Sequence, residues 1–240
     1  MVFPQTAYFA GLLEGDGCLS IHKAGSKFYP TIRLCLTDKE PVEGFRDFVN
    51  DYLHVEGLEK PLNVRRRSQS NRRWKDTFTV SFEGRRAEQL MRVFFPYWFS
   101  HRQEQVIRIF DKCTLDAPKQ STVSLGEEWL AGLSDAEGCF RRKVGGKTYA
   151  YFRVNMTDED IVGFLVSWLN KNVPPVKKRS GKGGQEKELQ VRAYLDKREN
   201  RKATYYCTLG GRRAVALCNL LKPYMLNATK LKELKAFEAK

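Results

Sequence analysis

Two stretches of similar sequence decide how this chain folds: FAGLLEGDG at residues 9–17 and LAGLSDAEG at residues 130–138. Each places apolar residues at helical spacing and then ends on two acids set among small residues. A helix C-terminus carries partial negative charge, which disfavours acids there by a few tenths to about 1 kcal/mol each. Because both copies keep this unfavourable arrangement, the acids are expected to share a role.

The rest of the chain repeats together with this motif. Gly11 corresponds to Gly132 (132 − 11 = 121), the segment at 33–40 recurs at 153–160 with an offset of 120, and GRRAEQLMRVFFPY at 84–97 recurs as GRRAVALCNLLKPY at 211–224 with an offset of 127. A unit of this length is a duplicated domain and is too long for a solenoid repeat. We expect an N-terminal unit at 1–112, a polar linker at 113–124 and a C-terminal unit at 125–240, with 127 − 120 = 7 residues inserted in the second half.

Hydrophobic periodicity predicts the same elements in each half. In the first half these are a helix at 5–16, strands at 18–23 and 31–37, a helix at 40–53, a hairpin with its second arm at 77–82, and two helices separated by Pro96. Within 31–37, Ile32, Leu34 and Leu36 alternate with Thr31, Arg33 and Cys35, as in a half-buried strand. Phe152, Val154 and Met156 repeat the inward pattern. The predicted class is α+β with antiparallel sheets.

Composition limits the class of partner. The 240 residues carry 42 Lys and Arg against 28 Asp and Glu, a net charge of +14, which favours nucleic acid over an anionic membrane. No apolar run approaches a bilayer span and the N-terminus lacks a secretory signal, so we expect an intracellular protein, without distinguishing an organelle, a bacterial or a phage host. Six cysteines without a C-x-x-C pair indicate small buried residues, not disulfides or a zinc site.

With its doubled motif, the chain resembles the monomeric, two-repeat LAGLIDADG homing endonucleases, of the single-chain, intron-encoded kind. FAGLLEGDG and LAGLSDAEG match the namesake helices, and the element order in each half matches the family's αββαββα unit. The resemblance implies two pseudo-twofold-related units whose antiparallel sheets form a DNA-binding saddle. It also implies a monomer that needs no protein partner.

Small residues four apart on one helical face, Gly11 with Gly15 and Gly132 with Ala136, allow two helices to pack backbone against backbone. Such pairing would bring the C-terminal acids Asp16 and Glu137 together with the carbonyls of Gly15 and Ala136. This hard oxygen set favours Mg²⁺. The alternative is that the acids are exposed loop residues. The resemblance assigns the metal to Asp16 and Glu137, and assigns Glu14 and Asp135 to helix packing or hydrogen bonding.

The resemblance also implies a basic catalytic residue near each cut phosphate, shortly after the proline that precedes the last helix of each half. KPYMLNATKLKEL points to Lys230, and FPYWFSHRQEQV points to Arg102, with His101 as the second choice and Gln103 or Gln105 as helpers. The alternative for each is a solvated helix residue.

Polar residues on the predicted strands form the expected DNA-reading set, because Arg, Gln and Asn read base edges while Lys mostly holds phosphate. Its members in the first half are Ser20, His22, Lys23, Arg33, Arg65, Arg67, Gln69, Arg72, Lys75, Thr77 and Thr79. Its members in the second half are Arg141, Lys143, Arg153, Asn155, Lys177, Arg179, Gln190, Arg192, Tyr194, Lys197, Arg198, Thr204 and Tyr206. Since the two sets differ, the target is expected to be long and asymmetric.

The resemblance therefore implies a Mg²⁺-dependent, site-specific endonuclease that makes a double-strand break in DNA and leaves short 3′ overhangs. Two alternatives use the same scaffold: a group I intron RNA maturase and a non-catalytic DNA-binding regulator. Retention of both acids favours the nuclease over the regulator.

Overall fold

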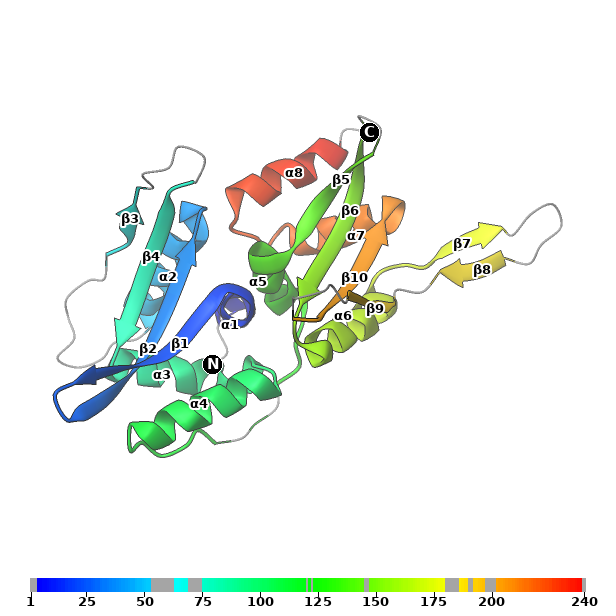
Figure 1. Cartoon of the computed structure of the whole chain (residues 1–240). Helices are drawn as coiled ribbons and strands as arrows, with labels where there is room; N and C mark the ends of the chain where they lie inside the picture. The colour runs from blue at the N-terminus through cyan, green and yellow to red at the C-terminus, as the bar shows by residue number, and fades with distance from the viewer. Residues whose placement is uncertain are drawn as a thin grey trace. The chain divides into compact units, whose positions relative to one another are not determined.

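The computed structural model describes residues 4–52, 63–68, 75–119, 121, 123–144, 147–179, 186–189, 192–196 and 202–238. Figure 1 traces the elements along the chain. They run in this order: α1 (Pro4–Asp16), β1 (Gly17–Ala24), β2 (Lys27–Leu36), α2 (Lys39–Tyr52), β3 (Arg65–Arg67), β4 (Thr77–Glu83), α3 (Arg85–Phe94), the 3-10 turn η1 (Phe95–Tyr97), α4 (Ser100–Lys112), α5 (Glu127–Glu137), β5 (Cys139–Val144), β6 (Lys147–Met156), α6 (Glu159–Asn172), β7 (Val176–Arg179), β8 (Glu186–Leu189), β9 (Ala193–Asp196), β10 (Thr204–Gly210), α7 (Gly211–Leu221) and α8 (Ala228–Glu238). The first half follows the predicted order, and the second half follows it with two additional strands, β7 and β8.

The first sheet is antiparallel with strand order β1-β2-β4-β3. Its inner face buries Ile32, Leu34 and Phe82 completely or almost completely, and α2 and α3 pack against β2 and β4. The period-two pattern thus places its apolar set against the helices and leaves the other face, here called the open face, to polar residues. Thr31 departs from the prediction, since it is buried on the open face of an interior strand between its register partners Ser20 and Glu83.

The second sheet repeats this arrangement with order β5-β6-β10-β9. Phe152, Val154 and Met156 are buried as expected, beneath α6 and α7. The predicted insertion lies between α6 and β9, where β7 and β8 pair with each other in a separate two-stranded sheet. Figure 1 shows this hairpin extending away from the four-stranded sheet.

Helices α1 and α5 pack together through their glycines. A Cβ added to Gly11 would lie 2.0 Å from the carbonyl oxygen of Trp129, and one added to Gly132 would lie 1.9 Å from that of Tyr8. Only the absence of a side chain allows backbones this close. Since 8 + 121 = 129 and 11 + 121 = 132, each contact is the pseudo-symmetric copy of the other.

The chain forms two compact units: Met1–Ala136 with Tyr224–Ala228, and Glu137–Pro223 with Thr229–Lys240. Helix α5 belongs to the second sequence repeat, but almost all of it joins the first unit because of the glycine contacts with α1. Among the described residues, no helix has the length and apolar character that a bilayer crossing requires.

All six cysteines are free thiols. The expectation that they are buried is wrong for three of them, because Cys18, Cys35 and Cys139 are exposed. Cys18 and Cys139 are register partners of open-face arginines, and Cys35 pairs with Thr79. Strand alternation therefore carries all three to the open faces of the two sheets.

Candidate functional site: two acidic helix ends and two open sheet faces

The four motif acids divide into two kinds. Asp16 is the last residue of α1 and is exposed, and Glu137 is the last residue of α5 and is partly exposed. Glu14 and Asp135, two residues earlier in each helix, are buried. Burial thus separates the two acids of each motif: the first is packed inside the protein, and the second, which the sequence assigns to the metal, lies nearer the surface.

Glu14 binds the start of α4. Its carboxylate accepts a hydrogen bond of 3.1 Å from the backbone N–H of Phe99, the N-cap residue of that helix. His101 Nε2 lies 3.2 Å from the same carboxylate. A helix N-terminus carries partial positive charge, so a buried carboxylate there is stabilised by the helix dipole as well as by the N–H donor.

Asp135 binds the backbone just ahead of α8 in the same manner. One carboxylate oxygen, Oδ2, accepts from the backbone N–H groups of Leu226 and Asn227, at 2.8 and 3.0 Å, directly before the helix begins. The same oxygen accepts a 2.6 Å hydrogen bond from the hydroxyl of Tyr8 on α1. Burial, and next the Asp135 charge, raise the pKa of Tyr8 well above its ordinary value, so the hydroxyl stays protonated and remains a donor. The role of Tyr8 has no signal in the sequence.

Arg102 closes the C-terminal end of α1. Its Nη2 atom donates to the carbonyl oxygens of Leu13, Glu14 and Gly17, at 3.2, 3.1 and 2.8 Å. The last carbonyls of a helix have no partner within the helix, so a guanidinium there satisfies them and opposes the negative end of the dipole. The three carbonyls lie on either side of Asp16, and Arg102 therefore fixes the backbone from which that carboxylate projects.

The predicted helpers also hold backbone groups. Gln105 Nε2 donates to the carbonyl of Leu19 at 3.0 Å, its Oε1 accepts from Arg102 Nη1 at 3.1 Å, and Gln103 Nε2 donates to the carbonyl of Phe95. Lys230 is partly exposed and is the third residue of α8, as Arg102 is the third residue of α4. The two predicted basic residues thus occupy equivalent places in the repeat.

The donor set at these helix ends fits Mg²⁺. The described residues contain no cluster of three or more His, Cys, Asp or Glu side chains. Mg²⁺ rarely needs one, since it is commonly held by one or two carboxylates together with substrate phosphates and water. The exposed carboxylate of Asp16 is a ligand of this kind.

The open face of the first sheet carries most of its predicted DNA-reading residues. Strand register places on it Ser20, His22, Arg33, Arg65, Arg67, Thr77 and Thr79. Arg33 Nε donates to Ser81 Oγ at 3.3 Å. Lys23 lies on the opposite face, with its ammonium over the Phe28 ring. It is four residues from buried Leu19 on the same strand, and side chains an even number of residues apart point to the same face. Lys75 is exposed just ahead of β4.

In the second sheet, the open face carries Arg153, Asn155, Tyr194, Thr204 and Tyr206. Arg141 is on the other face, where its Nε lies 2.9 Å from Glu233 of α8. A register irregularity between Cys139 and Arg141 explains this, because a one-residue shift moves every following side chain to the opposite face. Arg192 is exposed just before β9.

Part of the predicted set lies outside the described residues: Gln69, Arg72, Gln190, Lys197 and Arg198, and the side chains of Lys143, Lys177 and Arg179. The backbones of Lys177 and Arg179 belong to β7, so they are not in the four-stranded sheet where the prediction placed them. The reason is that β7 pairs with β8 in the inserted hairpin and so forms a separate sheet.

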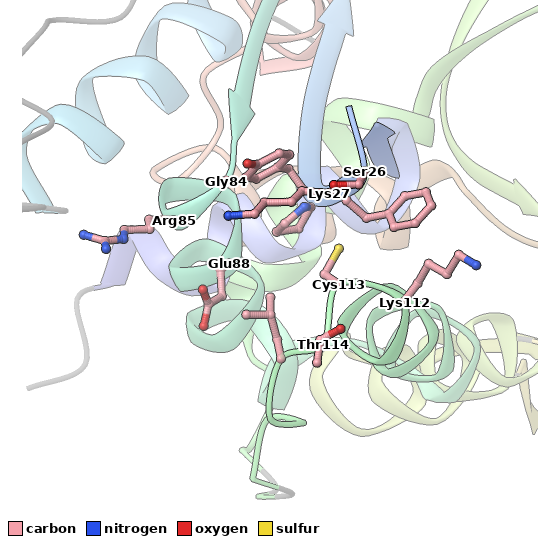
Figure 2. A pocket seen from close by; sticks show the side chains of 12 residues that line it. Ser26, Lys27, Gly84, Arg85, Glu88, Lys112, Cys113 and Thr114 are labelled. Carbon is pink, nitrogen blue, oxygen red and sulfur yellow. The ribbon is translucent and has the colours of Figure 1, made fainter. Parts of the chain in front are cut away.

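A pocket of about 490 Å³ in the first unit is separate from these groups. Its lining includes Lys27 and Phe28 at the start of β2, Glu88 of α3, and Lys112 and Cys113 at the end of α4, and Figure 2 shows the Arg85 side chain extending away from it. Arg102 and Lys112 are ten residues apart on one helix, so the pocket begins about 15 Å from the Arg102 end. It contributes nothing to the candidate site.

Comparisons with solved structures agree with this fold. No protein-family profile matches the sequence, and no curated protein does either. Among solved structures, the LAGLIDADG homing endonuclease I-LtrWI bound to target DNA is 15% identical with a TM-score of 0.60, over 98% of this chain and 89% of that one. The LAGLIDADG meganuclease I-AabMI bound to uncleaved DNA is 14% identical with a TM-score of 0.56, over 99% and 90%. The chain therefore has the LAGLIDADG homing endonuclease fold that its doubled motif predicts.

Proposed function

We propose that this protein is a site-specific DNA endonuclease that makes a Mg²⁺-dependent double-strand break in a long, asymmetric target and leaves short 3′ overhangs. The observation that carries the proposal is the pair of accessible acids, Asp16 and Glu137, at the ends of two helices joined through Gly11 and Gly132. The solved structures that share the fold include homing endonucleases bound to target DNA, which supports double-stranded DNA as the partner.

In the proposed reaction, Asp16 and Glu137 hold Mg²⁺ together with carbonyl groups such as those of Gly15 and Ala136. Bound there, the metal would supply activation of water for in-line attack on a phosphodiester and stabilisation of the leaving oxygen. Glu14 and Asp135 do not take part in this chemistry, since their carboxylates already accept hydrogen bonds from backbone N–H groups. They bind the backbone segments that lead into α4 and α8.

The two predicted basic residues have different parts in this proposal. Lys230 remains the proposed basic catalytic residue near a cut phosphate. Arg102 acts as a positioning residue, because its guanidinium is committed to three carbonyls around Asp16 and its side chain is only 13% exposed.

The asymmetry of the target is supported by the two open faces. Thr79 and Arg65 are register partners in the first sheet, and the equivalent pair in the second sheet is Tyr206 and Tyr194. Two faces with such different side chains should read two different half-sites. Both halves are present in one chain, so a monomer is sufficient.

The proposed function is tested by selection and cleavage. A pool of duplexes with a randomised central segment is incubated with the purified protein and Mg²⁺, the cleaved molecules are sequenced, and a plasmid carrying the selected site is digested. A linear product with 3′ overhangs is expected. Specific binding without cleavage would support the regulator alternative, and preferential binding of folded intron RNA would support the maturase.

Bound DNA is expected to protect the open-face cysteines from alkylation. Cys18, Cys35 and Cys139 are exposed thiols on the faces proposed to lie against DNA, so iodoacetamide should label them in the free protein and much more slowly in the complex. Peptide mass spectrometry reads each site separately. Cys207 is the internal control, because burial raises its pKa to about 12 and it should stay unlabelled in both states. Equal labelling of Cys18 and Cys139 with and without specific DNA would contradict the proposed surface.

Replacing Arg102 with Lys should slow cleavage roughly 10- to 100-fold, the range typical for partners that orient metal ligands. Lys keeps the positive charge but cannot reproduce the planar donor geometry that reaches three carbonyls. Arg108→Lys is the matched control, since Arg108 is exposed on the same helix and should tolerate the change. Single-turnover rates and the Mg²⁺ concentration at half-maximal rate are measured. Full activity in Arg102→Lys would show that charge alone matters and that Arg102 does not act through the α1 backbone.

A further inference from the structure

Three side chains from three strands stack in a row on the open face of the second sheet. Tyr206 of β10 and Tyr194 of β9 are register partners, with ring centroids 5.2 Å apart and planes 19° from parallel. Arg153 of β6 lies over the Tyr206 ring, with its Cζ 4.1 Å from the centroid. All three line a groove of about 530 Å³ together with Cys139, Tyr151 and Thr208.

The stack leaves the hydrogen-bonding edge of Arg153 available. A guanidinium that stacks on an aromatic ring uses its flat face, while its N–H groups point outward in the plane of the fork. Within the described part of the chain, the Arg153 side chain stacks on Tyr206 and makes no hydrogen bond or ion pair. A planar donor fork is thus held in one orientation on a surface proposed to contact DNA.

Two other arginines predicted to read bases, Arg141 and Arg33, have different surroundings. Arg141 is paired with Glu233 on the far side of the sheet, and Nε of Arg33 is committed to Ser81. Arg33 is the first-half counterpart of Arg153, since 33 + 120 = 153, and it has no aromatic neighbour across the strand because Thr79 replaces Tyr206. The stack therefore distinguishes one arginine of the second sheet from its repeat in the first.

We infer that Arg153 reads a guanine in the major groove of the target, donating from its fork to O6 and N7, and that the Tyr206–Tyr194 stack orients it for this contact. The inference rests on the proposed function and assigns one base reader within it. Guanine is the natural ligand, because its two neighbouring acceptors match the spacing of a guanidinium fork. A phosphate would accept the same charge without needing a fixed plane.

The test uses the full-length protein and duplexes derived from the selected site, each carrying one substituted base pair, with binding measured without Mg²⁺ so that no cleavage intervenes. The wild type should prefer guanine at one second-half position by about 5- to 100-fold. Arg153→Met should abolish that preference and leave the other positions unchanged. Tyr206→Leu should reduce the same preference while Arg153 is present, and Tyr206→Phe should retain it because the ring remains. Thermal melts verify folding of each variant.

Three outcomes would overturn the inference. If Arg153→Met weakens binding equally to every duplex, Arg153 holds phosphate. If Tyr206→Leu and Tyr206→Phe both keep the full guanine preference, the stack does not orient the arginine. If the wild type selects no sequence at all, the proposed function fails together with this inference, whereas selection that Arg153→Met does not alter counts against the inference alone. As a matched control, Arg33→Met should affect only first-half positions.

Discussion

Asp16→Asn should abolish or nearly abolish cleavage, by at least about 10³-fold, while DNA affinity stays close to that of the wild type. A catalytic metal contributes several kcal/mol to the transition state, and each 1.4 kcal/mol corresponds to tenfold in rate. Asn has nearly the same shape as Asp but lacks the negative charge that binds the cation. Because Asp16 is exposed at the end of α1, folding should be unaffected.

Glu137→Gln is expected to behave in the same way at the other helix end. Cleavage of a plasmid carrying the selected site and binding to a short duplex are measured for both variants. Asp111→Asn is the matched control, since it removes one exposed carboxylate from α4, nine residues along that helix from the Arg102 that binds the end of α1. If DNA binding is lost along with cleavage in Asp16→Asn, the acid has a structural role and the proposed metal site is wrong.

Gly132→Ala should destabilise the protein strongly although it adds a single methyl group. The new Cβ would lie 1.9 Å from the carbonyl oxygen of Tyr8 and 2.8 Å from the backbone nitrogen of Leu12, so the α1–α5 pair would have to separate. Overpacked sites typically cost about 1–3 kcal/mol and occasionally more, and here the neighbours are backbone atoms that cannot rotate away. We expect a loss of about 3 kcal/mol or more, a fall in Tm of roughly 6–12 °C.

Gly163→Ala gives the opposite expectation and is the control for helix propensity. Gly163 is exposed in α6, and a Cβ there meets nothing within 4 Å. Without a steric cost, Ala should stabilise that helix by about 0.5–1 kcal/mol. Both melts are followed by circular dichroism. A Gly132→Ala protein that melts at or above the wild-type temperature would contradict the close backbone packing of α1 and α5.

The two acids of each motif illustrate how neighbouring carboxylates can have unrelated tasks. Glu14 and Asp135 are buried at helix N-termini, where N–H donors and the dipole stabilise their charge. Asp16 and Glu137 lie at helix C-termini, where the dipole opposes their charge, and the proposed Mg²⁺ would offset it. Burial and the local end of a helix separate the two tasks.

Much of the architecture could be predicted because it depends on local patterns. The doubled motif indicated two helices, and the alternation around Ile32 and Phe152 indicated which strand faces are buried, since side-chain direction along a strand repeats every two residues. The need for small residues at Gly11 and Gly132 was also readable, because few arrangements besides close helix packing require glycine inside a helix. The sequence by itself thus determined the repeat, the fold class and the pairing glycines.

Only the tertiary structure decided which polar groups meet. Arg102 reaches carbonyls nearly 90 positions away in the chain, and Asp135 accepts from backbone N–H groups of Leu226 and Asn227, partners that have no side-chain signature. Arg141 lies on the face opposite to the predicted one because of a single register shift, and the alternation of residue types along a strand does not show such a shift. Contacts of this kind depend on where distant segments come together and on the direction in which long side chains extend. Neither is contained in a local pattern of residue types, so these roles follow only from the folded structure.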